Sequence, residues 1–165
     1  KGKTEGEGGG STPGGEEKPG EGNTVVMSDA YSSCTEGSVE AGTITFGDAT
    51  ITFEKNDGNN APMYYWNKTE AFRSVRMYAK NSMEMTATKN IAKVVINCAA
   101  PYSGTNYNGN DQMTTTAGTI SKSADKLSVT IDGINSKSFT LANEYTATTK
   151  GTQLRIVSMT ITYAE

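Results

Sequence analysis

The residues best suited to chemistry are aromatic and amide side chains that cluster in two stretches of the chain. In the first, Tyr64, Tyr65 and Trp66 are consecutive, follow a polar segment at residues 56–60 and precede Asn67. An exposed aromatic ring can stack on the apolar face of a sugar, while amides hydrogen-bond its hydroxyl groups. This group is therefore a candidate carbohydrate-binding surface.

An alternative interpretation places part of this group in the core. Successive side chains of a strand point to opposite faces of the sheet. Tyr64 and Trp66 would then share one face and Tyr65 the other. At least one of the three rings is therefore expected to be buried.

The second group lies in a stretch rich in glycine and asparagine that contains Tyr102, Tyr107 and Asn108. Loops rich in tyrosine and asparagine suit adaptable polar recognition, although the same composition is typical of a plain turn segment. We take seven residues as candidate ligand-binding residues and assign no catalytic residue. They are Tyr64, Tyr65, Trp66, Asn67, Tyr102, Tyr107 and Asn108.

Two sets of Asp and Asn side chains, within residues 57–60 and 108–111, could supply oxygen ligands to calcium. Neither set resembles the twelve-residue EF-hand loop, and neither contains a second carboxylate nearby. We assign no metal site and no cofactor, and the sequence leaves a structural calcium ion open.

The composition disfavours several function classes. The 165 residues include no histidine, which excludes Ser–His and Cys–His nucleophile pairs and imidazole metal ligands. A net charge of -3 disfavours nucleic-acid binding, and no run approaches the roughly 20 apolar residues that cross a bilayer. Glycoside hydrolysis needs two acids flanking a cleft, which the sequence cannot place. We therefore expect a protein that is not an enzyme, binds no nucleic acid and does not insert into a membrane.

The chain divides into a linker, residues 1–23, and a domain, residues 24–165. The linker holds nine of the 18 glycines, five Glu and three Lys, and no hydrophobic residue. Such a segment cannot bury enough apolar surface to offset its ordering entropy, so we expect a disordered tether or, alternatively, a frayed terminus. Cys34 and Cys98 either form one disulfide or stay unpaired, with Cys98 buried on a strand.

The elements that must position these residues are strands. Apolar residues alternate with polar ones in at least seven segments and never follow a helical period. The segments 43–46 and 50–53 read Thr-Ile-Thr-Phe twice around Gly47, as a hairpin would. Asp132-Gly133 indicates another turn. A break in alternation between Ile156 and Val157 predicts a β-bulge or, less simply, a strand buried on both faces.

Residues 42–163 resemble a β-sandwich module of surface and secreted lipoproteins of Bacteroides and related bacteria. The most specific parts are Ala61-Pro62-Met63-Tyr64-Tyr65 and Val75-Arg76-Met77-Tyr78. The resemblance implies a fold similar to jelly-roll carbohydrate-binding domains, with a mostly unassigned ligand. A Trp-Thr-Gly-like turn of such modules is replaced here by Asp132-Gly133-Ile134-Asn135, which lacks the Trp.

These observations predict an all-β fold: an antiparallel, jelly-roll-like β-sandwich preceded by the disordered Gly/Glu-rich tail. The expected function is that of a non-catalytic module that binds a polysaccharide or other glycan. The alternative is a structural or adhesive spacer domain without a small ligand. The resemblance and the linker imply a monomer at the bacterial cell surface or outside the cell, tethered to an upstream domain or a lipid anchor before residue 1.

Overall fold

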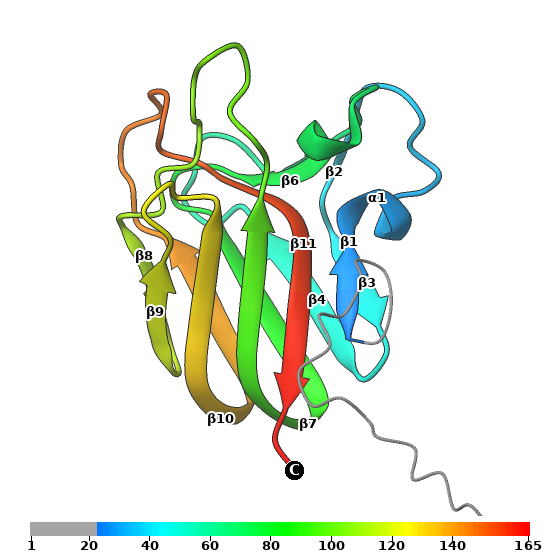
Figure 1. Cartoon of the computed structure of the whole chain (residues 1–165), viewed down its shortest axis with the longest axis vertical. Coiled ribbons are helices and arrows are strands. Elements are labelled where there is room, and N and C mark those ends of the chain that lie inside the picture. The colour runs from blue at the N-terminus through cyan, green and yellow to red at the C-terminus, as the bar shows by residue number, and fades with distance from the viewer. Residues whose placement is uncertain (1–22) are drawn as a thin grey trace, which may run out of the picture.

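The computed structural model describes residues 23–165, and these form one antiparallel β-sheet system with little helix (Figure 1). Apart from Asn23, the segment predicted to be a linker lies outside the described residues. The elements are β1 (Thr24–Val26), α1 (Met27–Ala30), β2 (Ser38–Glu40), β3 (Thr43–Phe46), β4 (Ala49–Glu54), β5 (Met63–Tyr65), η1 (Glu70–Phe72), β6 (Ser74–Met77), β7 (Ser82–Cys98), β8 (Met113–Thr115), β9 (Thr119–Lys122), β10 (Ser128–Asn143) and β11 (Leu154–Tyr163). The predicted all-β, antiparallel fold is confirmed.

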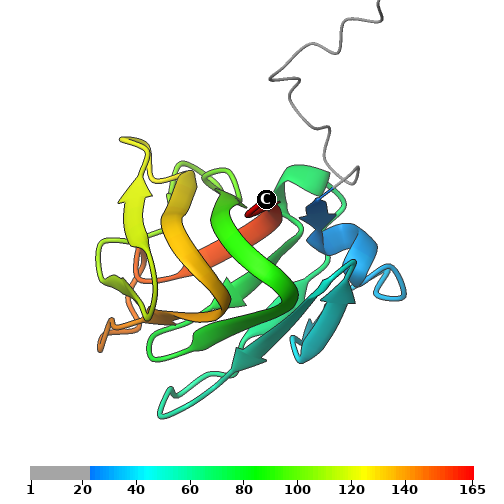
Figure 2. The same ribbon diagram turned by 90° about the horizontal axis from the view of Figure 1, so that it is seen from below.

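Two long strands, β7 and β10, run through both layers of the fold. Residues 82–87 of β7 pair with β4 and with the second half of β10, whereas residues 91–98 pair with β11 and with the first half of β10. Each strand bends between its halves, so the sheet folds over and its two layers face each other (Figure 2). The jelly-roll connectivity stays a prediction.

The bend of β10 falls where the sequence predicts a turn. Gly133 and Asn135 have φ angles of 69° and 47°, and the pairing with β7 shifts register between Asp132 and Ser136. The chain continues afterwards as the same strand, so the expected separate strands are wrong at this point. Positive φ values at two nearby residues turn the strand sharply without ending it.

The core lies between the layers and is built from the alternation seen in the sequence. One layer contributes buried residues of β4, β7 and β10, and the other contributes buried residues of β7, β10 and β11. They include Ile51, Phe53, Met83, Met85 and Leu141 from the first layer and Val94, Ile96, Val129, Ile131 and Ile161 from the second. The predicted inward faces of these strands are confirmed.

The predicted bulge in β11 is confirmed, and it separates the part of β11 that pairs with β6 from the part that pairs with β1. Ile156 pairs with Cys98 and Ser158 with Asn97, so Val157 is an extra residue on β11. Before the bulge, residues 154–156 of β11 pair with β6, and after it residues 158–160 pair with β1. In the part that pairs with β6, Arg155 lies directly opposite Arg76.

Both cysteines are free thiols, so the disulfide alternative is not formed. Cys34 is buried against the core, and Cys98 ends β7. Burial raises the pKa of the Cys98 thiol to about 12. Within residues 23–165, no helix is long and apolar enough to span a membrane.

Candidate functional site

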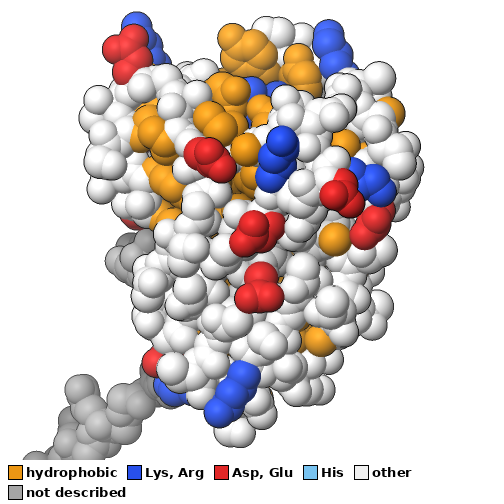
Figure 3. Space-filling model, turned by 180° about the vertical axis from the view of Figure 1, so that it is seen from behind, with side chains coloured by type: hydrophobic (Ala, Val, Ile, Leu, Met, Phe, Trp, Pro, Cys, Tyr) orange, Lys and Arg blue, Asp and Glu red, His pale blue; other side chains and the backbone are white. Residues whose placement is uncertain are grey.

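A pocket of about 300 Å³ opens over β5, β6 and β11, between the segment that carries η1 and the loop that follows β7. Its lining residues are Tyr65, Trp66, Asn67, Phe72, Arg76, Tyr102, Tyr107 and Arg155. Apolar and aromatic side chains gather toward the upper part of the face in Figure 3, with basic side chains among them. The fold thus brings together members of both groups that the sequence analysis treated separately.

Alternation along β5 separates its two tyrosines. Tyr64 pairs with Val75 in β6, is fully buried and stacks on Tyr31 with ring centroids 4.7 Å apart. It therefore belongs to the core and does not line the pocket. Tyr65 points the other way, into the pocket.

Trp66 and Asn67 follow the end of β5 and are held by Arg73. The Arg73 Nε donates to the Asn67 carbonyl oxygen at 2.6 Å, and its Cζ lies 5.0 Å from the centre of the Trp66 ring. The Asn67 Oδ1 accepts from the Thr69 amide at 2.8 Å. Trp66 is half-buried, packing against the core while also lining the pocket.

Tyr102 forms the exposed side of the pocket. Its ring meets Phe72 edge to face at 5.3 Å, and the residue is 48% exposed. A tight turn holds it, because the amides of Tyr102 and Thr105 each donate to the other's carbonyl oxygen at 2.9 and 3.0 Å. Ser103 and Gly104 between them have positive φ angles. The Tyr102 ring is therefore presented on a short, ordered loop with one side open for stacking.

Tyr107 and Arg155 form the opposite side. The Arg155 Cζ lies 3.9 Å from the centre of the Tyr107 ring, and the Arg155 Nε donates to Gln153 Oε1 at 2.9 Å. Arg155 is only 8% exposed. Burial, together with the nearby positive charge of Arg76, lowers the pKa of Arg155 to about 10. The guanidinium therefore keeps its charge at neutral pH.

Asn108 does not line the pocket but fixes the backbone beside it. Its Oδ1 accepts from the Arg155 amide and its Nδ2 donates to the Ala99 carbonyl, both at 2.9 Å. The residue is 2% exposed, so its amide is committed to these bonds. Asn108 therefore positions the backbone of β11 next to the pocket. Its side chain is buried outside the lining, so its predicted contact with a ligand stays a prediction.

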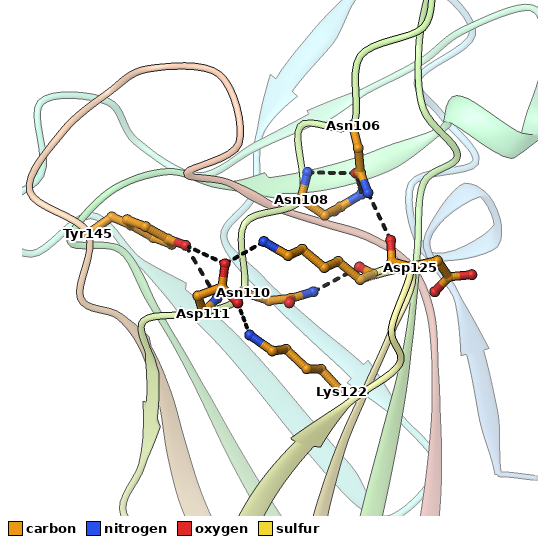
Figure 4. Close-up of polar contacts among 8 residues, drawn as sticks. Asn106, Asn108, Asn110, Asp111, Lys122, Asp125 and Tyr145 are labelled. Carbon is orange, nitrogen blue, oxygen red and sulfur yellow. Dashed lines mark hydrogen bonds and ion pairs between the residues drawn. The ribbon is translucent and has the colours of Figure 1, made fainter.

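The loop that carries Tyr107 is anchored by polar contacts of Asn106 and Asp111, one on either side of that residue (Figure 4). Asp111 forms ion pairs with Lys122 and Lys126. Asn106 Nδ2 donates to the Asp125 carbonyl at 2.9 Å, and the Tyr145 hydroxyl donates to Asp111 Oδ2 at 3.5 Å. The described side chains include no group of three His, Cys, Asp or Glu suited to a metal ion.

Gly109 lets this loop touch the segment before β11. A Cβ placed on Gly109 would lie 2.0 Å from the Gly151 carbonyl oxygen, and the Gly109 amide donates to the Gln153 carbonyl at 2.9 Å. We expect Gly109→Ala to lower the free energy of unfolding by about 1–3 kcal/mol, because the contacting backbones must move apart. Gly42→Ala is the control, since a Cβ there meets nothing within 4 Å. Equal urea midpoints for the two variants would contradict this expectation.

Three lining residues, Phe72, Arg76 and Arg155, were not among the predicted candidates. A charged residue between Leu154 and Ile156 in an apolar strand is the one signal that could have pointed to Arg155. Comparison with protein-family models gives no match, and comparison with curated proteins gives none either. The geometry of the pocket is therefore the observation on which a functional proposal depends.

Proposed function

We propose that this chain is a non-catalytic module of a bacterial cell-surface protein and that it binds carbohydrate in the pocket over β5, β6 and β11. The observation that carries the proposal is the convergence of Tyr65, Trp66, Tyr102 and Tyr107 on one pocket. Tyr102 has an exposed ring of the kind that stacks on a sugar, whereas Tyr65, Trp66 and Tyr107 each carry an arginine over one ring face and have the other face left for a ligand. A volume of about 300 Å³ is at the small end of ligand sites.

The chemistry of the lining favours binding over catalysis. The described residues that line the pocket include no Asp, Glu or Cys. Hydrolysis of a glycosidic bond ordinarily needs two carboxyl groups at the reacting position. Arg76 and Arg155 can donate hydrogen bonds but keep their protons, so they are poor general bases.

Cell-surface placement rests on the resemblance described from the sequence, since the pocket itself carries no information about location. A tethered monomer that presents this pocket to a polysaccharide is consistent with the resemblance and with the lining of the pocket. The alternative is a structural or adhesive spacer domain whose pocket has no small ligand.

Affinity electrophoresis of the full chain through gels containing plant, host and bacterial polysaccharides tests the proposal. We expect retardation by at least one polysaccharide, and a loss of at least tenfold in affinity for Tyr102→Ala and Trp66→Ala, because each removes a stacking ring. A tenfold loss corresponds to about 1.4 kcal/mol. Tyr102→Ala is the cleaner variant because its side chain is the most exposed of the pocket rings.

Tyr163→Ala is the matched control, since Tyr163 ends β11 away from the pocket and carries Lys89 5.8 Å above its ring. This variant should keep wild-type mobility in the gel. Thermal unfolding of each variant shows whether lost binding reflects lost folding. Failure of every polysaccharide to retard the wild-type chain would reject carbohydrate binding and favour the spacer.

A further inference from the structure

We propose that the glycan bound in this pocket is acidic, and that its carboxylate or sulfate group binds between the guanidinium groups of Arg76 and Arg155. The inference rests on the proposed function and names the class of sugar. Four observations support it: the placement of the two arginines, the N–H donors of their guanidinium groups, their charge without an ion-pair partner among the described residues, and the aromatic rings around them.

The two arginines are placed together by strand register. Arg76 of β6 and Arg155 of β11 are direct antiparallel partners, so both side chains leave the same face of the sheet and line the same pocket. Like charges directly opposite each other destabilise a sheet. A pair of this kind inside a pocket is explained if an anion lies between them.

Each guanidinium is oriented by a tyrosine ring. The Cζ of Arg76 lies 3.7 Å from the centre of the Tyr65 ring, and that of Arg155 lies 3.9 Å from the centre of the Tyr107 ring. Stacking covers a face of the planar group and leaves the N–H groups at its edge available. Edge donors in this arrangement match the paired oxygens of a carboxylate or sulfate.

Several of these donors are open to a ligand, although the Tyr78 hydroxyl also lies within hydrogen-bonding reach of Arg76. Among residues 23–165, the Arg155 guanidinium makes one hydrogen bond, from Nε to Gln153. The Nε of Arg76 is buried and has no hydrogen-bond partner in the described part of the chain. A buried donor without a partner costs about 1–3 kcal/mol, more when it is charged, so the site is built at a cost in stability that its remaining N–H groups, at the edge of each guanidinium, can offset by binding an anion.

The charge of the pair is likewise uncompensated. The ion pairs formed within residues 23–165 involve Asp48, Asp111 and Glu144, and none reaches Arg76 or Arg155. The chain as a whole has a net charge of -3, so the two arginines form a local basic site on an acidic protein. This arrangement suits one anionic group on a ligand better than the extended phosphate backbone of a nucleic acid.

The rings around the pair favour a sugar acid over a free inorganic anion. Tyr102 and Trp66 line the same pocket as the arginines, so one ligand can stack its ring and pair its charge at once. Uronic acids and sulfated sugars share this chemistry. Both present an oxyanion on an otherwise apolar-faced ring.

The test measures binding of the full chain to matched polysaccharides by affinity electrophoresis and calorimetry. Polygalacturonate is compared with its carboxyl-reduced form, and chondroitin sulfate with desulfated chondroitin. We expect the acidic member of at least one pair to bind at least tenfold more tightly than its neutral or less charged partner. The pair that shows this preference distinguishes carboxylate from sulfate.

Arg76→Gln and Arg155→Gln should each reduce binding of the acidic polysaccharide at least tenfold and bring it close to the binding of the neutral form. Lys150→Gln is the control, because it removes an exposed positive charge outside the pocket and should bind as the wild type does. If either arginine variant fails to fold, competition on the wild-type chain replaces it: free galacturonate or sulfated monosaccharide should displace the polysaccharide, whereas galactose should not.

The outcomes separate the two proposals. Equal binding of acidic and neutral forms, unaffected by the arginine substitutions, would overturn the acidic-ligand inference while leaving carbohydrate binding intact. Absence of binding to every polysaccharide would overturn both. Binding of inorganic sulfate alone, with no polysaccharide bound, would also overturn the inference, because it would show an anion site without a glycan.

Discussion

Tyr64→Ala is expected to lower the free energy of unfolding by about 3–5 kcal/mol, which makes it one of the most damaging single substitutions in the chain. Tyr64 is fully buried, stacks on Tyr31 at 4.7 Å with an angle of 11° between the rings, and packs into the main core. Removing the ring leaves a cavity that surrounding strands cannot close. Urea denaturation followed by far-UV circular dichroism measures the change.

Tyr64→Phe provides the matched comparison because it keeps the ring and removes only the hydroxyl. The Tyr64 hydroxyl is buried, with no hydrogen-bond partner among residues 23–165. Burial also raises the pKa of the phenol, so the group stays neutral. Because deleting an unpartnered polar group removes a desolvation cost, stability should be unchanged or higher.

Glycan binding by Tyr64→Phe should equal that of the wild type, since Tyr64 faces the core. A large loss of stability on changing Tyr64 to Phe would show that the hydroxyl has a partner. A loss of binding without a loss of stability would show that Tyr64 contacts ligand after all.

Asn81→Asp is expected to cost about 3–5 kcal/mol at neutral pH although it changes the shape of the side chain very little. Asn81 is fully buried immediately before β7. Its Nδ2 donates to the carbonyl oxygens of Lys55 and Asn60 at 3.1 and 2.9 Å, and its Oδ1 accepts from the Tyr78 amide at 2.8 Å. A carboxylate would place a buried negative charge against two carbonyl oxygens.

The penalty should depend on pH in a defined direction. Burial and the facing carbonyl oxygens raise the pKa of the new carboxyl in the folded protein above its unfolded value of about 3.9. Below that value the group is neutral in both states and can donate one hydrogen bond. As the pH rises above it, the unfolded chain loses the proton first, so stability falls until the folded carboxyl is also ionised.

Denaturation midpoints of Asn81→Asp and wild type at pH 3.5 and pH 7 test this expectation. The difference between the two proteins should be larger at pH 7. Asn81→Ala is the control: it loses the same hydrogen bonds without introducing a charge, so its deficit should vary little with pH. A deficit of Asn81→Asp that is independent of pH would contradict the explanation.

The strands could be predicted because alternation is a local signal. Ile51 and Phe53, for example, are two apart in the sequence and share a face whatever the rest of the fold does. The same reasoning located the bulge at Val157, where the alternation changes phase. It failed at Gly133, because whether a strand stops or bends depends on hydrogen bonds to a distant partner strand.

The candidate site was predictable only in part for the same reason. Composition singled out Tyr65, Trp66, Tyr102 and Tyr107, but nothing local shows that two loops meet over one pocket. Arg76 and Arg155 lie side by side because of the register between β6 and β11, two strands that are far apart in the sequence. Tyr64 could not be separated from Tyr65 without knowing which face of β5 is buried.

The position of β11 has a consequence for how the molecule assembles. The last strand in the sequence lies in the interior of the sheet, between β6 and β7, and the β1 hydroxyl of Thr24 meets that of Thr160 across 136 residues of chain. Contacts of such sequence separation slow the search for the native state. The edges of β6, β7 and β1 that β11 covers can therefore be paired only once residues 154–163 are available to fold onto them. The side of the pocket that Tyr107 and Arg155 form is therefore completed only when β11 is in place.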